Sequence, residues 1–85
     1  MTNKIIFAVR DVKADAYLPP FFMNTKGQAI RALQDSASQD PNSAFARHPQ
    51  DFDLYLLGMY DDVSGKIGVD DESVYIGNLS ELITA

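Results

Sequence analysis

Two segments of the chain are rich in apolar residues with few polar interruptions, and this pattern predicts two β-strands. In residues 4–12, β-branched and aromatic side chains dominate, and Ile5, Phe7 and Val9 share one face. In residues 52–60, one face carries Leu54, Leu56 and Tyr60, and the other carries Tyr55, Leu57 and Met59. Because both faces of each segment are largely apolar, we expect the two strands to be covered on both sides, as central strands are.

A helix is predicted to begin after Thr25 and to end before the Asp-Pro pair at 40–41. Thr25 as N-cap, with Gln28 three residues later, forms a capping box in which each side chain satisfies a free backbone N–H. Leu33 lies in an apolar stripe at helical spacing. The helix ends because a residue that precedes proline avoids the α-helical backbone region. One further helical turn is expected around Phe45.

The C-terminal part of the sequence, from residue 61 on, predicts a hairpin followed by short elements. Residues 61–65 have the composition of a turn, and Gly65 suits the left-handed position of a bulged hairpin loop. The expected elements after it are a returning strand at 66–69, an acidic turn at 70–72, a short strand at 73–76 and a last helical turn capped by Asn78. We therefore expect residues 1–85 to form a single domain of the α+β class: a small antiparallel sheet of three to four strands with one main helix packed on it.

A stiff segment connects the first strand to the helix. Pro19 and Pro20 fix their own φ angles and donate no backbone N–H, so residues 13–23 are predicted to form an extended, polyproline-like arm. The aromatic side chains on this arm are Tyr17, Phe21 and Phe22. Of the rings of Phe21, Phe22 and Phe45, we expect two in the core. Tyr17 is the ring that we expect to remain accessible.

Length and composition limit the classes of protein to which the chain can belong. A chain of 85 residues buries a small core, so self-association is the expected source of added stability. It has no cysteine, which excludes disulfides and thiolate metal sites, and its single histidine, His48, argues against a zinc centre. Arg10 and Asp11 interrupt the apolar N-terminal stretch, which is therefore expected to be neither a signal peptide nor a membrane span. We expect an intracellular protein without cofactor or metal.

Charge is distributed unevenly although the net charge is −5. Residues 1–48 hold six cations against four anions, and residues 49–85 hold one cation against eight anions. Cations that follow phosphates and exposed rings that stack on bases hold single-stranded nucleic acid without sequence readout. The residues predicted to bind single-stranded DNA in this way are Arg10, Lys13, Tyr17, Lys26, Arg31 and Arg47.

Catalytic patterns are weak in this sequence. The paired carboxylates at 61–62 and 70–71 fall in predicted turns, where aspartate is common for backbone reasons. No glycine pattern of a nucleophile elbow or of a phosphate-binding loop is present. We therefore predict no catalytic residue and no enzymatic activity.

Three stretches of the sequence resemble the corresponding stretches of one known protein family. These are AVRDVKADAYLPPFF, GQAIRAL and DPNSAFARHPQDFDLYLLGMYDDVSGKI, which together span most of residues 4–67. They resemble the small non-structural, DNA-binding-type protein of gokushoviruses, which are microviruses with small circular single-stranded DNA genomes. By analogy with the small protein C of related phages, the resemblance implies a role in single-stranded genome synthesis and packaging. It also implies that the protein acts in the host bacterial cytoplasm and is absent from the mature virion.

The same arm supports a second hypothesis, which the sequence leaves open. A pre-stiffened segment with aromatic side chains also suits contact with another protein. The residues predicted to bind a partner are Tyr17, Leu18, Pro19, Pro20, Phe21 and Phe22. The expected partners are a second copy of the chain, in a homodimer or higher oligomer, or the phage replication initiator.

Overall fold

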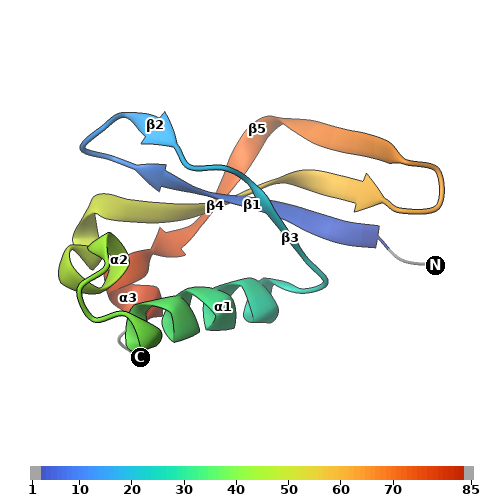
Figure 1. The fold of residues 1–85 in the computed structure, drawn as a ribbon. Helices are drawn as coiled ribbons and strands as arrows, with labels where there is room; N and C mark the ends of the chain where they lie inside the picture. The colour runs from blue at the N-terminus through green and yellow to red at the C-terminus, as the bar shows by residue number, and fades with distance from the viewer. Residues whose placement is uncertain (1–2, 84–85) are drawn as a thin grey trace.

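The computed structural model describes residues 3–83, apart from the side chains of residues 70 and 71. Along the chain its strands are β1 (Asn3–Asp11), β2 (Ala16–Tyr17), β3 (Phe21–Met23), β4 (Phe52–Asp61) and β5 (Lys66–Asn78). Its helices are α1 (Lys26–Gln39), α2 (Ala44–Arg47) and α3 (Leu79–Leu82), with a 3-10 turn, η1, at Pro49–Asp51. Figure 1 shows the three helices on the same side of the sheet, so no helix within residues 3–83 covers the opposite side.

All strand pairs are antiparallel, in the order β2-β1-β4-β5, and β3 also pairs with β1. The predicted α+β fold with three to four strands and one main helix is wrong. Strands make up 44% of the chain, and in the part that the structure describes α1 is the one helix longer than a single turn. The main reason lies in residues 13–23, which contribute β2 and β3 because their backbone groups pair with the free edge of β1.

Local signals at the helix ends are confirmed. Thr25 caps α1, since its hydroxyl accepts the Gln28 N–H at 3.1 Å, while the Gln28 side chain accepts the Asn24 N–H at 3.1 Å. The expected turn around Phe45 is α2, and Asn78 caps α3 by accepting the Ser80 N–H at 3.1 Å. These bonds satisfy backbone donors that a helix start leaves free.

The hydrophobic core lies between the helices and one face of the sheet. Its buried members come from β1, α1, β4 and α3: Phe7, Val9, Ala29, Leu33, Phe52, Leu54 and Leu79. Phe21 stacks on Phe7 with ring centroids 5.8 Å apart, and Phe45 packs against Phe52. Of the three rings weighed above, Phe21 and Phe45 therefore contact the core, whereas Phe22 is 43% exposed, so the prediction of two is confirmed.

The β4–β5 hairpin has the predicted turn but a different course after it. Gly65 adopts φ 76°, and Asp61 accepts the N–H groups of Val63 and Ser64 in the turn. The expected acidic turn at 70–72 is wrong, because β5 continues through these residues. Pairing is irregular there, since Leu56 pairs with Val74 but Gly58 pairs with Val69. The extra residues lie on β5, as in a β-bulge.

Candidate functional site

The side of the sheet without helices is the candidate functional site, and we call it the helix-free face. Residues that pair across antiparallel strands point to the same face, and successive residues of a strand alternate between faces. Phe7 and Val9 of β1 belong to the core, so Lys4, Ile6, Ala8 and Arg10 belong to the helix-free face. Their partners on β2, β3 and β4 are Tyr17, Phe22, Asp53, Tyr55, Gly58 and Tyr60.

All four tyrosines of the chain lie on the helix-free face. Tyr55 packs edge-on against Tyr17 on one side and against Tyr75 on the other, with ring centroids 5.7 Å apart in each pair. These three rings form a row across β2, β4 and β5, which we call the tyrosine row. Tyr60 packs edge-on against Phe22 at 5.5 Å. Tyr17 is 50% exposed and Tyr75 is 54% exposed, so both ends of the row are open to ligands.

Small and aliphatic residues of β1 form the base beneath these rings. Ala8 is 1% exposed and Ile6 is 5% exposed, although neither belongs to the core cluster under the helices. Ala8 pairs with Tyr55, and Ile6 pairs with Phe22. Because Ala8 has a short side chain, the rings from the strands on either side of β1 can meet above it.

Arg10 supplies positive charge beside the tyrosine row. It pairs with Tyr17 on β2 and with Asp53 on β4. Its guanidinium donates a hydrogen bond to the Asp15 carboxylate in an ion pair, and this bond raises the pKa of Arg10 above its ordinary value. Asp15 adopts a positive φ of 55° and is 83% exposed at its side chain. The guanidinium of Arg10, which pairs across strands with Tyr17, is therefore already bound to a carboxylate of the β1–β2 turn.

The far end of the tyrosine row is acidic. Asp53 accepts a hydrogen bond from Asn78 Nδ2 at 2.8 Å. Partial desolvation raises the pKa of Tyr75, and the charges of Asp53 and Glu81 raise it further. Two carboxylates therefore lie near Tyr75, and one of them, Asp53, also pairs across strands with Arg10.

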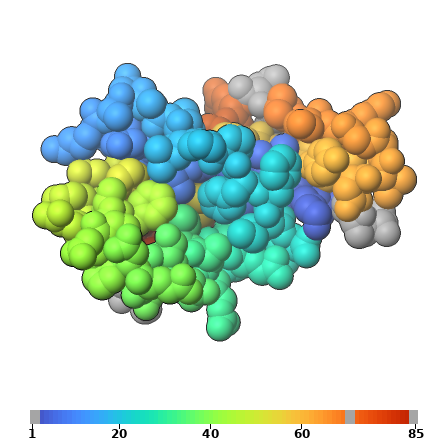
Figure 2. All heavy atoms as spheres, viewed as in Figure 1, coloured from blue at the N-terminus to red at the C-terminus, as the bar shows by residue number. Residues whose placement is uncertain are grey.

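The predicted DNA-binding cations do not converge on one surface. Arg10 belongs to β1 and pairs with Tyr17, and Lys13 lies in the β1–β2 turn. Lys26 and Arg31 are on α1 and Arg47 is on α2, on the helical side of the sheet. Figure 2 shows this helical segment at the bottom of the molecule and the β1–β2 turn at the upper left. These cations therefore belong to separate elements on different sides of the sheet, although all of them lie within residues 10–47.

The predicted partner-binding arm divides between the two faces. Tyr17 and Phe22 are exposed on the helix-free face, and Pro19 and Pro20 are exposed in the link between β2 and β3. Leu18 and Phe21 are half-buried and pack against the core. A partner could therefore reach only part of the arm without disturbing the fold.

Three of the four tyrosines were missed as site residues by sequence reasoning. Tyr60 was expected on the same face as Leu54 and Leu56, but an irregularity between Leu56 and Gly58 moves it to the face of Tyr55. Tyr75 joins the row only through its register with Tyr55. The sequence signal that was available is that Tyr55 lies between Leu54 and Leu56 in a predicted strand. This places Tyr55 on the opposite face from the two leucines but does not show what covers that face.

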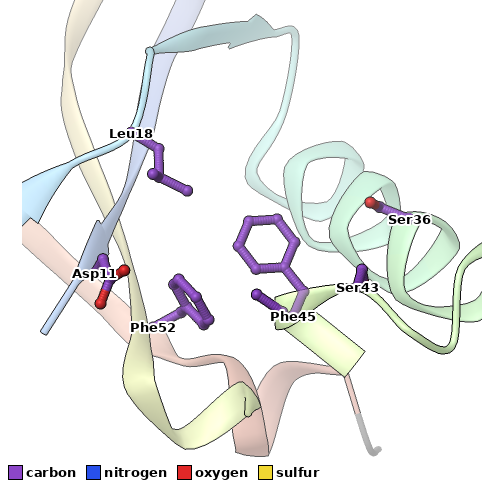
Figure 3. A pocket seen from close by; sticks show the side chains of 7 residues that line it. Asp11, Leu18, Ser36, Ser43, Phe45 and Phe52 are labelled. Carbon is purple, nitrogen blue, oxygen red and sulfur yellow. The ribbon is translucent and has the colours of Figure 1, made fainter. Parts of the chain in front are cut away.

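A hollow lies on the helical side, at the end of the sheet. It has a volume of about 350 Å³ and is lined by Asp11, Leu18, Ser36, Ser43, Ala44, Phe45 and Phe52. Figure 3 shows Asp11 on one side of it, the two serines on the other, and Leu18 and the two phenylalanine rings between them.

The fold and the site define a small antiparallel sheet protein, with helices on one face and an aromatic surface on the other. A family model described as phage ORF5 protein matches residues 4–82. The chain therefore belongs to the phage ORF5 protein family, and the expectation of a phage protein is confirmed. Comparison with curated proteins gave no match, and comparison with solved structures gave none either.

Two further observations concern metals and membranes. Among residues 3–83, leaving out the side chains of residues 70 and 71, no cluster of three or more histidine, aspartate or glutamate side chains is arranged to hold a metal ion. None of the helices in the same range is long and apolar enough to cross a membrane.

Proposed function

We propose that this phage protein binds single-stranded DNA during viral genome synthesis and packaging, by stacking bases on the tyrosine row. The observation that carries the proposal is the gathering of all four tyrosines on the helix-free face, with Tyr17 and Tyr75 half exposed. Aromatic rings bind successive bases of a single strand without reading sequence, at about 1–3 kcal/mol per base. The gokushovirus resemblance supports the same ligand.

The proposed mode of binding depends more on stacking than on charge. Of the cations predicted from the sequence, Arg10 pairs across strands with Tyr17 but is bound to Asp15, and Lys13 lies in the adjoining β1–β2 turn. Each phosphate contact to a single strand contributes about −0.7 to the slope of log affinity against log salt. We therefore expect a shallow salt dependence, with a slope of about −1.

Intrinsic fluorescence offers a direct test, because the chain has four tyrosines and no tryptophan. All of the intrinsic emission therefore comes from the helix-free face. Titration with a thymidine decamer at low salt is expected to quench this emission with saturation, and a blunt duplex of equal length is expected to quench it far less. The absence of saturable quenching at micromolar protein would falsify the proposal.

Matched variants localise the effect. Tyr17→Ala and Tyr75→Ala are each expected to weaken binding roughly tenfold or more, since each removes one stacking surface worth about 1–3 kcal/mol. Val63→Ala changes a side chain that is 78% exposed in the hairpin turn, away from the tyrosine row, and serves as the control. Equal losses in all three variants would show that binding lies elsewhere.

The second candidate function is that of a protein–protein adaptor, which self-associates and docks to the phage replication initiator. It is favoured by the β4–β5 hairpin, where Ile67, Val69 and Val74 are 60%, 69% and 50% exposed. Exposed apolar groups on an edge strand are typical of surfaces that pair with another chain. Sedimentation at increasing protein concentration tests self-association, and a monomer at every concentration would contradict that part of the hypothesis.

A further inference from the structure

The hollow on the helical side has the character of a preformed binding site. Three hydrogen bonds hold the segments that line it. Val12 N–H donates to the Asp51 carbonyl at 2.9 Å, Leu18 N–H donates to the Val9 carbonyl at 2.8 Å, and Ser43 Oγ accepts the Ala46 N–H at 3.3 Å. The rings of Phe45 and Phe52 meet edge-to-face at 4.9 Å and form the base. Because these contacts within the chain hold the lining residues in place, binding requires little ordering.

The lining of the hollow combines a large apolar area with one charge. Leu18, Phe45 and Phe52 provide the apolar part. Asp11 is the one charged residue among those that line it. Its Oδ1 accepts the Ala14 N–H at 3.1 Å, which fixes the carboxylate at the rim. The nearby cation Arg47 is exposed on α2 and is not part of the lining. The hollow therefore favours a ligand that combines an apolar group with a positive charge over one that is neutral or anionic.

We propose that this hollow binds a segment of a partner protein that presents a bulky apolar side chain next to a lysine or arginine. The volume of about 350 Å³ accommodates one large side chain and its neighbour's aliphatic stem. The apolar side chain packs on the Phe45 and Phe52 rings, and the cation reaches the Asp11 carboxylate. Ser36 and Ser43, from α1 and the start of α2, face Asp11 across the hollow and offer hydroxyls to the main chain of the segment.

This site is separate from the tyrosine row and goes beyond the DNA-binding proposal. Asp11 and Phe52 pair across β1 and β4 on the helical face of the sheet, whereas the tyrosines point to the opposite face. A protein with both sites can hold a nucleic acid on one face and a partner protein on the other. Failure of either proposal leaves the other intact, because no residue of the hollow belongs to the row.

Short peptides blocked at both ends test the proposal on the full-length chain. The probe is acetyl-Gly-Phe-Lys-Gly-amide, compared with versions that carry glutamate for lysine or alanine for phenylalanine. Backbone amide shifts in NMR titrations are expected to saturate at Asp11 and at residues 43–46 with the first peptide. The glutamate version is expected to bind about threefold to tenfold more weakly, as one partly exposed ion pair allows. The alanine version is expected to give no saturable shifts.

Three variants identify the residues responsible. Asp11→Asn is expected to remove the preference for lysine over glutamate, while Glu72→Gln, the same charge change at an exposed position of β5, is expected to retain it. Ala44→Leu fills the hollow from an exposed position and is expected to abolish binding of all peptides without unfolding the protein. The proposal is overturned if the first peptide gives no saturable shifts, if the shifts map elsewhere, or if Asp11→Asn leaves the discrimination unchanged.

Discussion

The two faces of the sheet use different aromatic residues, and the difference follows from what covers each face. On the helical face the rings are phenylalanines: Phe7 and Phe52 are 0% and 5% exposed, and Phe21 and Phe45 pack against them. On the helix-free face four of the five rings are tyrosines. A phenolic hydroxyl is costly to bury without a partner but keeps a ring compatible with water.

This contrast distinguishes a core from a surface within one small sheet. Ala8 and Ile6 are as well buried as the core residues, yet the groups that cover them are half-exposed rings rather than a helix. The helix-free face is thus stabilised by ring packing while it remains accessible. A face of this kind can both shield β1 and bind a planar ligand.

The largest expected effect tests whether the two faces contribute unequally to stability. Phe7→Ala is expected to lower the free energy of unfolding by about 3–5 kcal/mol, because it leaves a cavity under the helices. Tyr17→Ala is expected to cost only about 1 kcal/mol, the value of one edge-on ring pair. Urea denaturation of both variants measures the difference. Equal losses would mean that the tyrosine face is a second core, and the comparison would fail.

The next effect concerns the close approach of β4 and β5 at Gly58. A Cβ on Gly58 would lie 2.2 Å from the Gly68 carbonyl oxygen and 3.0 Å from the Val69 Cα. Gly58→Ala is therefore expected to cost about 1–3 kcal/mol by overpacking. Gly68→Ala meets nothing within 4 Å and is expected to change stability by less than about 0.5 kcal/mol.

Thermal or urea unfolding of the two glycine variants gives the comparison directly. If Gly68→Ala proved as destabilising as Gly58→Ala, close approach of the two strands could not be the cause. An intrinsic preference for glycine along the hairpin would then be the better explanation.

A smaller effect is expected at the Arg10–Asp15 ion pair. Asp15→Asn removes the carboxylate that competes with phosphate for Arg10, and asparagine tolerates the left-handed backbone at this position. Under the proposed function, single-stranded DNA should bind more tightly, and its salt slope should steepen by about 0.7, the value of one added phosphate contact.

The control for this variant is Asp35→Asn, which makes the same change of net charge on the exposed surface of α1. It is expected to leave the salt slope unchanged in fluorescence titrations. Weaker binding by Asp15→Asn would show instead that the ion pair holds Arg10 in its active position.

The smallest effect is a difference among the tyrosines in alkaline titration. Partial desolvation and the nearby carboxylates Asp53 and Glu81 raise the pKa of Tyr75 above its ordinary value of 10.0. The folded state therefore favours the neutral phenol. The resulting stability is fully present below pH 10.0 and is lost as the pH rises through the folded-state pKa. Absorbance of the phenolate should show a late phase that Tyr75→Phe removes. A single phase in the parent protein would contradict this prediction.

Much of the local structure could be predicted from the sequence. The capping box at Thr25, the end of α1 at Gln39, the turn at Gly65 and the cap at Asn78 depend on residues within a few positions of each other. Such interactions are encoded locally, so their residue types indicate them directly. The two long strands were predicted from their runs of β-branched, aromatic and other apolar residues.

The composition of the candidate site was predicted only in part. Arg10 and Tyr17 are near one another because they pair across the tight turn that carries Lys13. Lys26, Arg31 and Arg47 were grouped with them by charge alone, and the fold places them on helices on the other side of the sheet. Chain order carries no information on which face of a sheet a distant helix will cover.

By itself, the sequence determined the two long strands, the turn at Gly65 and the helix ends, because these depend on backbone preferences and side-chain bonds over short distances. Only the tertiary structure decided that residues 13–23 would add two strands to β1, and that Tyr55, Tyr60 and Tyr75 would join Tyr17 on one face. These outcomes depend on strand register and on a single irregularity between Leu56 and Gly58. A shift of one residue in register reverses which side of the sheet every side chain faces.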